Sequence, residues 1–293
     1  MTAGVPDTLT AWIGRSESAE GVISQELVDR MAATFDSIAV PAGTIPLGAH
    51  WCVALIPSPM QGLGVDGHPA KGGLLPPVPF PRRMWAGGNL EFHDRFQIGD
   101  VARRVSIVTD IQYKSGRTGP LAFVTITHLW TTARGPAVTE RQDLVYRSPQ
   151  QETAPIAPRP TRGDHDATQI IMGVDAHRLT PDAAMLFRYS ALTFNAHRIH
   201  YDRDYAVKVE GYSERVVQGP LQATALMNFA STISGPPSRF TFRSTRPAFV
   251  NRALTLAVTA RDGPSLSLAA VDDVGSVCMQ AEWTVAASRA GTP

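Results

Sequence analysis

The chain has 293 residues, a formal net charge of +1, 43% hydrophobic residues and 18% charged residues. This composition is typical of a globular protein of one large or two ordinary domains, and the near-neutral charge argues against a broad nucleic-acid surface. Two cysteines, Cys52 and Cys278, are too few for a disulfide framework or a zinc site. The sequence shows no secretory signal pattern and no apolar run near the ~20 residues that span a bilayer, so we expect a cytoplasmic protein that contacts no membrane.

The first predicted element is a helix at residues 23–35. Apolar side chains recur there at helical spacing, and Ser24 has the side chain of a typical N-cap. A short apolar segment follows at 47–56. The stretch 57–88 is so rich in glycine and proline that its sequence indicates no regular element.

The middle of the chain predicts an antiparallel meander. From about 90 to 147, apolar residues alternate with polar ones, and turn residues interrupt the pattern at 115–116 and 135–136. The segment 148–167 has few large apolar residues. It is therefore the best candidate for a linker between two domains.

The C-terminal half predicts a buried helix followed by strands. Residues 219–234 carry apolar side chains on more than one face of a helix, Pro220 suits its first turn, and Gly235 ends it. Between 240 and 285, alternating apolar residues separated by turn residues predict four antiparallel strands. A long buried helix followed by such strands indicates a sheet that wraps around a helix.

The N-terminal half looks like a degenerate copy of the C-terminal half. It also has a helix followed by strands, but its helix is shorter. No close residue-level repeat is visible, so the duplication rests on the pattern of elements alone. We predict an α+β fold with one domain at 1–147, a linker at 148–167 and a second domain at 168–293.

Residues suited to catalysis gather between Tyr189 and Leu221. Asn195 and His200 lie five residues apart in one loop, and Gly219 opens the apolar helix. An amide, an imidazole and the free N–H groups of a helix N-terminus can move a proton beside a polarised carbonyl. Structural alternatives stay open: His200 and Asn195 could serve a turn, and Gly219 could serve packing. Tyr189 is expected to pack, with its hydroxyl as a candidate site group.

This run resembles the hydratase motif of MaoC-type proteins, which have the hot dog fold. Their usual pattern is Tyr, then Ser-Gly-Asp-x-Asn-Pro-x-His, and later His-Gly-Met at the start of the central helix. The matching residues are Tyr189, 193–200 and 218–220. The closer resemblance is to type 2 hydroxyacyl-thioester dehydratases and mesaconyl-C4-CoA or itaconyl-CoA hydratases, which residues 82–88 and 114–121 also resemble. It implies a double hot dog, with two antiparallel sheets each wrapped around a helix and a catalytic C-terminal copy.

The resemblance implies reversible addition of water across the double bond of a short 2-enoyl-CoA. The expected substrate is mesaconyl-C4-CoA or itaconyl-CoA, and the expected product is citramalyl-CoA. Two alternatives stay open: a 3-hydroxyacyl-thioester dehydratase of fatty-acid synthesis, and a non-catalytic acyl-CoA-binding protein. We expect no cofactor, no metal ion and no nucleic acid, and a monomer or homo-oligomer of double hot dogs.

The resemblance also suggests catalytic roles. His200 is the expected base, since a neutral imidazole titrates near working pH. Gly219 matches the family's donor to the thioester carbonyl, where the helix dipole favours developing negative charge. The motif has Asp at the position of Asn195; because an amide cannot act as a base, we expect Asn195 to hold the catalytic water. If residues 199–204 are extended, Asp202 shares a face with His200 and could orient the imidazole.

Further residues are expected to bind the substrate or support the site. Arg198, beside the catalytic loop, is a candidate partner for a free substrate carboxylate. His197 is expected at the surface or behind the catalytic residues, and His128 is expected to be structural. The cations that could meet the CoA phosphates are Arg82, Arg83, Lys114, Arg117 and Arg215.

Overall fold

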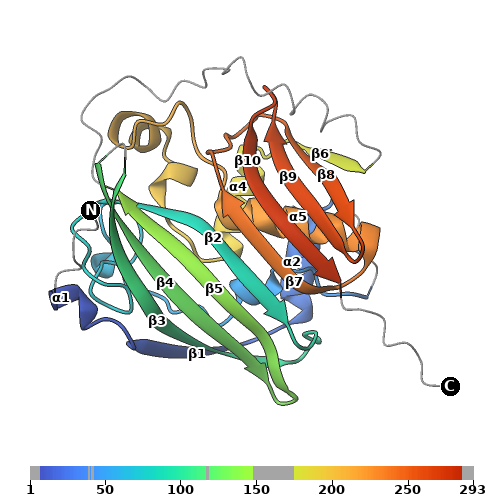
Figure 1. Ribbon diagram of the computed structural model, residues 1–293, viewed down its shortest axis with the longest axis horizontal. Helices are drawn as coiled ribbons and strands as arrows, with labels where there is room; N and C mark the ends of the chain where they lie inside the picture. The colour runs from blue at the N-terminus through green and yellow to red at the C-terminus, as the bar shows by residue number, and fades with distance from the viewer. Residues whose placement is uncertain (1–6, 39, 41–42, 117–118, 148–174, 286–293) are drawn as a thin grey trace.

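The computed structural model describes residues 7–38, 40, 43–116, 119–147 and 175–285. Its central feature is an antiparallel sheet with the strand order β1-β3-β4-β5-β2-β7-β10-β9-β8-β6 (Figure 1). The N-terminal half contributes β1 (Ser16–Val22), β2 (Arg82–Phe92), β3 (Val101–Gly116), β4 (Gly119–Thr132) and β5 (Gly135–Arg147). The C-terminal half contributes β6 (Ala176–Leu179), β7 (Pro237–Ser244), β8 (Leu254–Asp262), β9 (Ser265–Asp272) and β10 (Val277–Val285). The predicted linker lies outside the described residues, and the division into domains stays a prediction.

The two halves of the sheet meet where β2 pairs with β7. Gly87 lies opposite Arg243 in this ladder, and Gly88 lies opposite Phe242. A Cβ atom on Gly87 would lie 2.6 Å from the carbonyl oxygen of Phe242, and one on Gly88 would lie 2.6 Å from that of Arg141. Glycine fits at so close an approach because it has no side chain. The two glycines therefore let the halves join edge to edge.

The longest helix, α5 (Gly219–Ser234), packs against the C-terminal strands and β2 (Figure 1). Pro220 lies in its first turn, and Gly235 ends it with a positive φ of 79°. Leu221 and Leu226 are fully buried, and burial of one such side chain stabilises the fold by about 1.5–3 kcal/mol. The predicted buried helix with strands around it is confirmed.

The N-terminal half has a shorter helix, α2 (Gln25–Thr34), as predicted. The Ser24 hydroxyl accepts the N–H of Leu27 at 3.1 Å and caps the helix. Helix α2 packs on α4 (Ala183–Leu192) and on the 3-10 turn η1 (Ala49–Cys52). Side chains on the inner face of β4 and β5 therefore remain available to line a cavity between the halves. The arrangement confirms the predicted double hot dog with a degenerate N-terminal copy.

Several elements were not predicted from the sequence. Strand β1 reads Ser-Glu-Ser-Ala-Glu-Gly-Val and pairs only with β3 at the edge of the sheet, so it lacks an apolar pattern. Strand β2 begins at Arg82 rather than near residue 90. None of the helices in the described ranges is both long and apolar enough to cross a membrane. The other elements are α1 (Asp7–Thr10), η2 (Met60–Gly62), η3 (Arg198–His200) and the π-helical turn η4 (Tyr205–Val209).

Candidate active site

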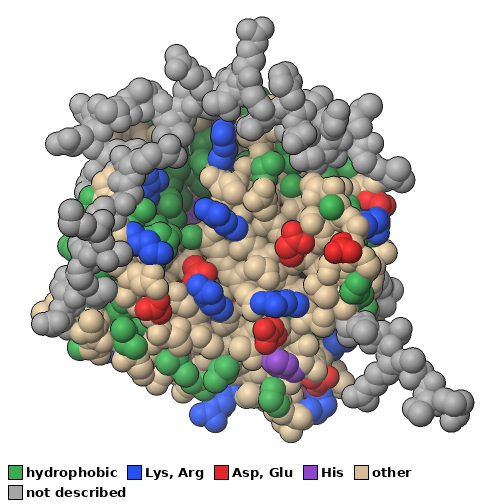
Figure 2. Space-filling view, in the orientation of Figure 1, with side chains coloured by type: hydrophobic (Ala, Val, Ile, Leu, Met, Phe, Trp, Pro, Cys, Tyr) green, Lys and Arg blue, Asp and Glu red, His purple; other side chains and the backbone are tan. Residues whose placement is uncertain are grey.

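A cavity of about 760 Å³ lies between the two halves of the molecule. The N-terminal half lines it with side chains of β2, β4, β5 and the loop that follows η1. The C-terminal half lines it with the loop after α4, the start of α5 and residues 244–247. On the face shown in Figure 2, hydrophobic side chains line a hollow, and Lys and Arg side chains lie around it. Such a mixture suits a ligand with an apolar arm and anionic groups.

The predicted catalytic loop begins directly after α4. Phe194 has a positive φ of 49°, which turns the chain sharply. The N–H of Asn195 then donates to the carbonyl of Ser190 at 2.9 Å, and its side-chain oxygen accepts the N–H of His197 at 3.0 Å. Asn195 thus forms the Asx-turn considered as its alternative role. Since Asn195 also lines the cavity, its amide nitrogen can still contact a water there.

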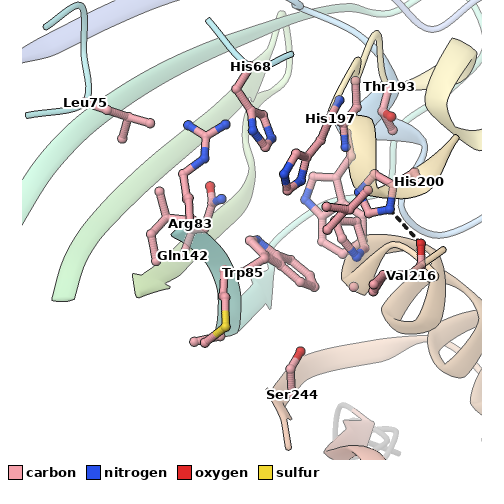
Figure 3. A pocket seen from close by; sticks show the side chains of 18 of the residues that line it. His68, Leu75, Arg83, Trp85, Gln142, Thr193, His197, His200, Val216 and Ser244 are labelled. Atoms are coloured by element: carbon pink, nitrogen blue, oxygen red, sulfur yellow. Dashed lines mark hydrogen bonds between the residues drawn. The ribbon is translucent and has the colours of Figure 1, made fainter. Parts of the chain in front are cut away.

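His200 lies in η3 and is 8% exposed. Its Nδ1 lies 2.7 Å from the carbonyl oxygen of Val216 (Figure 3). A carbonyl can only accept, so Nδ1 carries the proton and Nε2 keeps its lone pair. Burial, together with the nearby charge of His197, lowers the pKa of His200 to about 3. His200 is therefore a neutral imidazole at the cavity wall with Nε2 available as a base.

Gly219 lines the cavity as the first residue of α5. Its N–H has no acceptor within the helix, because the first turn of any helix leaves its donors unpaired. A Cβ atom at this position would lie only 2.8 Å from Cε3 of Trp85. The Trp85 ring is held by stacking on Phe242 at 4.3 Å and by an edge contact with Trp51 at 5.7 Å. The glycine therefore gives the tryptophan and a ligand close access to the N-terminus of α5.

The expectation that Asp202 orients His200 is wrong. Residues 199–204 are not extended, because the 3-10 turn η3 is followed closely by η4. The Asp202 carboxylate accepts hydrogen bonds from Arg198 at 2.6 Å and from the N–H of Tyr205 at 3.0 Å. Val216 fixes the imidazole of His200 instead.

Arg198 lies outside the lining of the cavity. It pairs with Asp202, donates to the carbonyl of Val65 at 3.1 Å and stacks on the ring of Tyr205 at 4.2 Å. Its charge is already neutralised, so its position gives no support to the expected contact with a substrate carboxylate.

The profile of the hydroxyacyl-thioester dehydratase type 2 family matches residues 48–250. The chain belongs to this family. It is 44% identical over 247 residues to a mesaconyl-C(4)-CoA hydratase of Chloroflexus aurantiacus, and the alignment covers 82% of this chain and 84% of the relative. The family predicted from the motif at 189–220 is confirmed.

Solved structures agree with the fold. A MaoC-like dehydratase aligns with a TM-score of 0.68 at 16% identity, over 96% of this chain and 100% of the other. A Mycobacterium tuberculosis protein with a double hotdog fold aligns with a TM-score of 0.50 at 17% identity, over 92% of this chain and 95% of the other. At these identities the similarity supports the fold alone.

The other expected substrate-binding residues lie in different places. Tyr189 is buried and lines the cavity, and its hydroxyl is 3.2 Å from that of Thr224. Burial raises its pKa well above the usual range, so it stays protonated. Arg82 lines the cavity, whereas Lys114 is exposed outside it. Arg117 lies outside the described residues.

This member of the dehydratase family also has a histidine at the cavity, His68, that the sequence analysis missed. His68 Nδ1 lies 3.1 Å from one carboxylate oxygen of Asp66, and the other oxygen accepts the backbone N–H of His68. Gly67 between them has a positive φ of 86°, and its backbone packs against the carbonyl of Ala196 in the catalytic loop. Burial and the charge of Arg83 lower the pKa of His68 to about 3. The Asp-Gly-His turn at 66–68, inside an unassigned Gly-rich stretch, was the available signal.

His197 joins the two histidine sites. Its ring centroid lies 4.1 Å from that of His68 and 5.3 Å from that of His200, and Glu210 lies 3.6 Å from its Nε2 (Figure 3). It is buried beside His200, so of its two expected positions the structure gives the one behind the catalytic residues and not the surface. Ligand atoms of Asp66, His68 and His197 lie within 4.8 Å of one another. Hydrogen bonds join Asp66 to His68, and the His197 ring packs on that of His68; the expectation of no metal stays a prediction.

Proposed function

We propose that the chain catalyses the reversible hydration of a short 2-enoyl-CoA, with mesaconyl-C4-CoA as substrate and citramalyl-CoA as product. The observation that supports this most is the neutral His200, which Val216 holds by Nδ1 at the wall of a cavity that Gly219 also lines. The C-terminal half thus offers both a base and an unpaired N–H donor to this cavity. The 44% identity to a protein named as a mesaconyl-C(4)-CoA hydratase supports the choice of substrate.

The proposed chemistry needs one water molecule and returns the protein to its starting state. Nε2 of His200 takes a proton from the water while the water oxygen attacks the β-carbon of the thioester. Charge then develops on the thioester oxygen, and the Gly219 N–H and the dipole of α5 stabilise it by roughly 3–4 kcal/mol. The enolate collapses as the imidazolium of His200 delivers the same proton to the α-carbon. Water has then been added across the double bond, and His200 is neutral again.

A low pKa makes His200 a weaker base toward water but makes its imidazolium a stronger acid, so it suits the second proton transfer. An imidazole whose pKa is lowered to about 3 forms a strongly acidic imidazolium, which readily gives up its proton to a carbanion-like α-carbon. Asn195 can hold the attacking water by a hydrogen bond, since the Asx-turn uses its side-chain oxygen and not its amide nitrogen. This division of roles does not require the carboxylate that the family motif has at position 195.

A second candidate is the dehydration of longer 3-hydroxyacyl thioesters, which the name of the matching family favours. The same base and donor would serve, because the reaction is the reverse of hydration. A CoA-thioester substrate, a cytoplasmic location, a monomer or homo-oligomer, and the absence of nucleic acid as a partner remain expectations within this proposal. A non-catalytic acyl-CoA-binding role is the third alternative.

The test is a spectrophotometric screen of enoyl-CoAs that differ in length and charge, following loss of the conjugated thioester absorbance. We expect turnover of mesaconyl-C4-CoA above that of long-chain enoyl-CoAs. His200→Gln should lower kcat by about 10²–10⁴-fold. His93→Gln is the matched control, since His93 is exposed on the N-terminal half and contacts Thr139. Full activity of His200→Gln would contradict the proposed base, and a preference for long acyl chains would favour the dehydratase.

A further inference from the structure

Arg83 extends from β2 into the cavity, on the wall that faces His197 and His200 (Figure 3). Side chains two residues apart on a strand point to the same face. Arg83 therefore shares its face with Trp85, whose ring touches the position of Gly219. The strand advances about 3.3 Å per residue, so the Cα atoms of Arg83 and Trp85 lie about 7 Å apart. Arg83 thus lines the same cavity as Gly219, two residues along β2 from the tryptophan that packs at this glycine.

Arg83 is only partly exposed, and its one side-chain partner among the described residues is the hydroxyl of Tyr146, a neutral group that does not offset its charge. The charge of Arg83 acts on His68, whose neighbour Asp66 already accepts two hydrogen bonds from His68. Across the ladder, Arg83 lies opposite Tyr146, a buried residue. A half-buried cation without a counter-charge is costly unless an anion binds to it. The arginine is therefore available to a ligand anion.

Gln142 presents a second donor to the same cavity. Its side-chain oxygen lies 2.7 Å from Nε2 of His128, whose Nδ1 lies 2.8 Å from the hydroxyl of Ser106. The amide oxygen can only accept, so Nε2 of His128 carries the proton and Nδ1 accepts from Ser106. This chain of bonds fixes the orientation of the Gln142 amide. Its NH₂ group remains as a donor at the cavity wall, close to the stem of Arg83 (Figure 3).

We propose that Arg83 and Gln142 form a carboxylate-binding subsite that selects enoyl-CoAs with a carboxylate on the β-carbon. The inference rests on the proposed hydratase function and names the residues that recognise its substrate. In such a substrate three carbon–carbon bonds separate the thioester carbon from the carboxylate carbon, a span of about 4 Å. With a hydrogen bond of about 3 Å at each end, such a substrate can bridge two donors about 10 Å apart, and Gly219 and Arg83 line one cavity. The subsite replaces Arg198 in the role that the sequence suggested.

The experiment compares binding of succinyl-CoA and butyryl-CoA by calorimetry. Both thioesters lack the double bond that would be hydrated, have acyl chains of equal length, and differ only in carrying a carboxylate or a methyl group on the β-carbon. We expect the wild-type protein to bind succinyl-CoA at least about tenfold more tightly. Arg83→Gln should bring the two affinities within about threefold by weakening succinyl-CoA alone. Arg243→Gln is the matched control: it removes one charge from the exposed face of β7 and should keep the preference.

Gln142→Glu provides an independent variant with nearly unchanged shape. The new carboxylate still accepts the bond from His128, but it repels an anion, so succinyl-CoA should weaken and butyryl-CoA should not. Equal affinities of the wild-type protein for succinyl-CoA and butyryl-CoA would overturn the subsite. A preference for succinyl-CoA that persists in both Arg83→Gln and Gln142→Glu would overturn it too. Hydration of mesaconyl-C4-CoA is scored separately. If the wild-type protein prefers succinyl-CoA but does not hydrate mesaconyl-C4-CoA, the proposed function is contradicted. If it hydrates mesaconyl-C4-CoA and both variants keep the full preference for succinyl-CoA, the subsite alone is contradicted.

Discussion

The sharpest test of the site is the substitution Gly219→Ala. The added Cβ would lie 2.8 Å from Cε3 of Trp85, whereas carbon atoms in contact prefer about 3.5–4.0 Å. One of the two groups must therefore move by roughly 0.7–1.2 Å. The Trp85 ring cannot retreat freely, because Trp51 and Phe242 pack against it.

We expect two measurable effects from Gly219→Ala. Overpacking of this kind costs about 1–3 kcal/mol of unfolding free energy, which should appear as a lower Tm in thermal denaturation. A displacement of about 1 Å at the oxyanion donor should lower kcat/KM for hydration by about 10²-fold. The hydration rate is followed by the loss of conjugated thioester absorbance.

The control and the rescue variant separate a steric effect from a general one. Gly62→Ala adds a methyl group at an ordinary 3.5 Å from Pro59 and should change neither Tm nor rate. The double variant Gly219→Ala/Trp85→Phe should be at least about tenfold faster than Gly219→Ala alone, because the two side chains contact and their effects are not additive. Wild-type kcat/KM in Gly219→Ala would refute the placement of the thioester at this helix end.

Three further predictions concern the catalytic loop. Asn195→Asp keeps the oxygen that accepts the His197 N–H, so the protein should fold and keep partial activity, reduced about 10–100-fold with a changed pH optimum; complete loss would show that the amide donor is essential. Arg198→Ala breaks the pair with Asp202 and should lower kcat/KM less than about threefold, equally for mesaconyl-C4-CoA and crotonyl-CoA; a selective loss of the former would restore Arg198 as the carboxylate partner. The pKa of His200 is lowered from 6.5 to about 3, so between these values the unfolded chain binds a proton that the folded chain does not. Stability should therefore fall as pH falls through this window, by up to about 1.4 kcal/mol per pH unit. Between about pH 7 and pH 5, the Tm of His200→Gln should fall less than the Tm of the wild-type protein. An equal fall in both proteins would contradict this.

Local sequence signals were enough to predict the elements whose packing they encode directly. The helix at 219–234 was predicted to the residue, because it is apolar on all faces and is marked by Pro220 and Gly235. The polar edge strand at 16–22 was missed, since one-sided pairing at the edge of a sheet demands no apolar alternation. The loop at 193–200 was identified because its residue types are contiguous in the sequence.

The rest of the site depends on contacts between distant segments. Assigning an extended backbone to 199–204 led to the wrong partner for His200, whose carbonyl acceptor is sixteen residues away. His68 and Gln142 reach the cavity only through the pairing of β2 with β5 and the docking of the 66–68 turn on the catalytic loop. No spacing rule along the chain reveals such neighbours, because they arise from tertiary structure.

The short α2 leaves the inner face of β4 and β5 as one wall of the cavity, while the proposed base and the proposed oxyanion donor come from the other half. A duplicated architecture of this kind separates reactivity from selectivity: one copy retains the chemistry, and the other is free to vary the shape and polarity of the space that the acyl group enters. Exchanging inward-facing residues of the N-terminal strands should therefore redirect such a protein to new acyl groups without altering the residues that handle the proton.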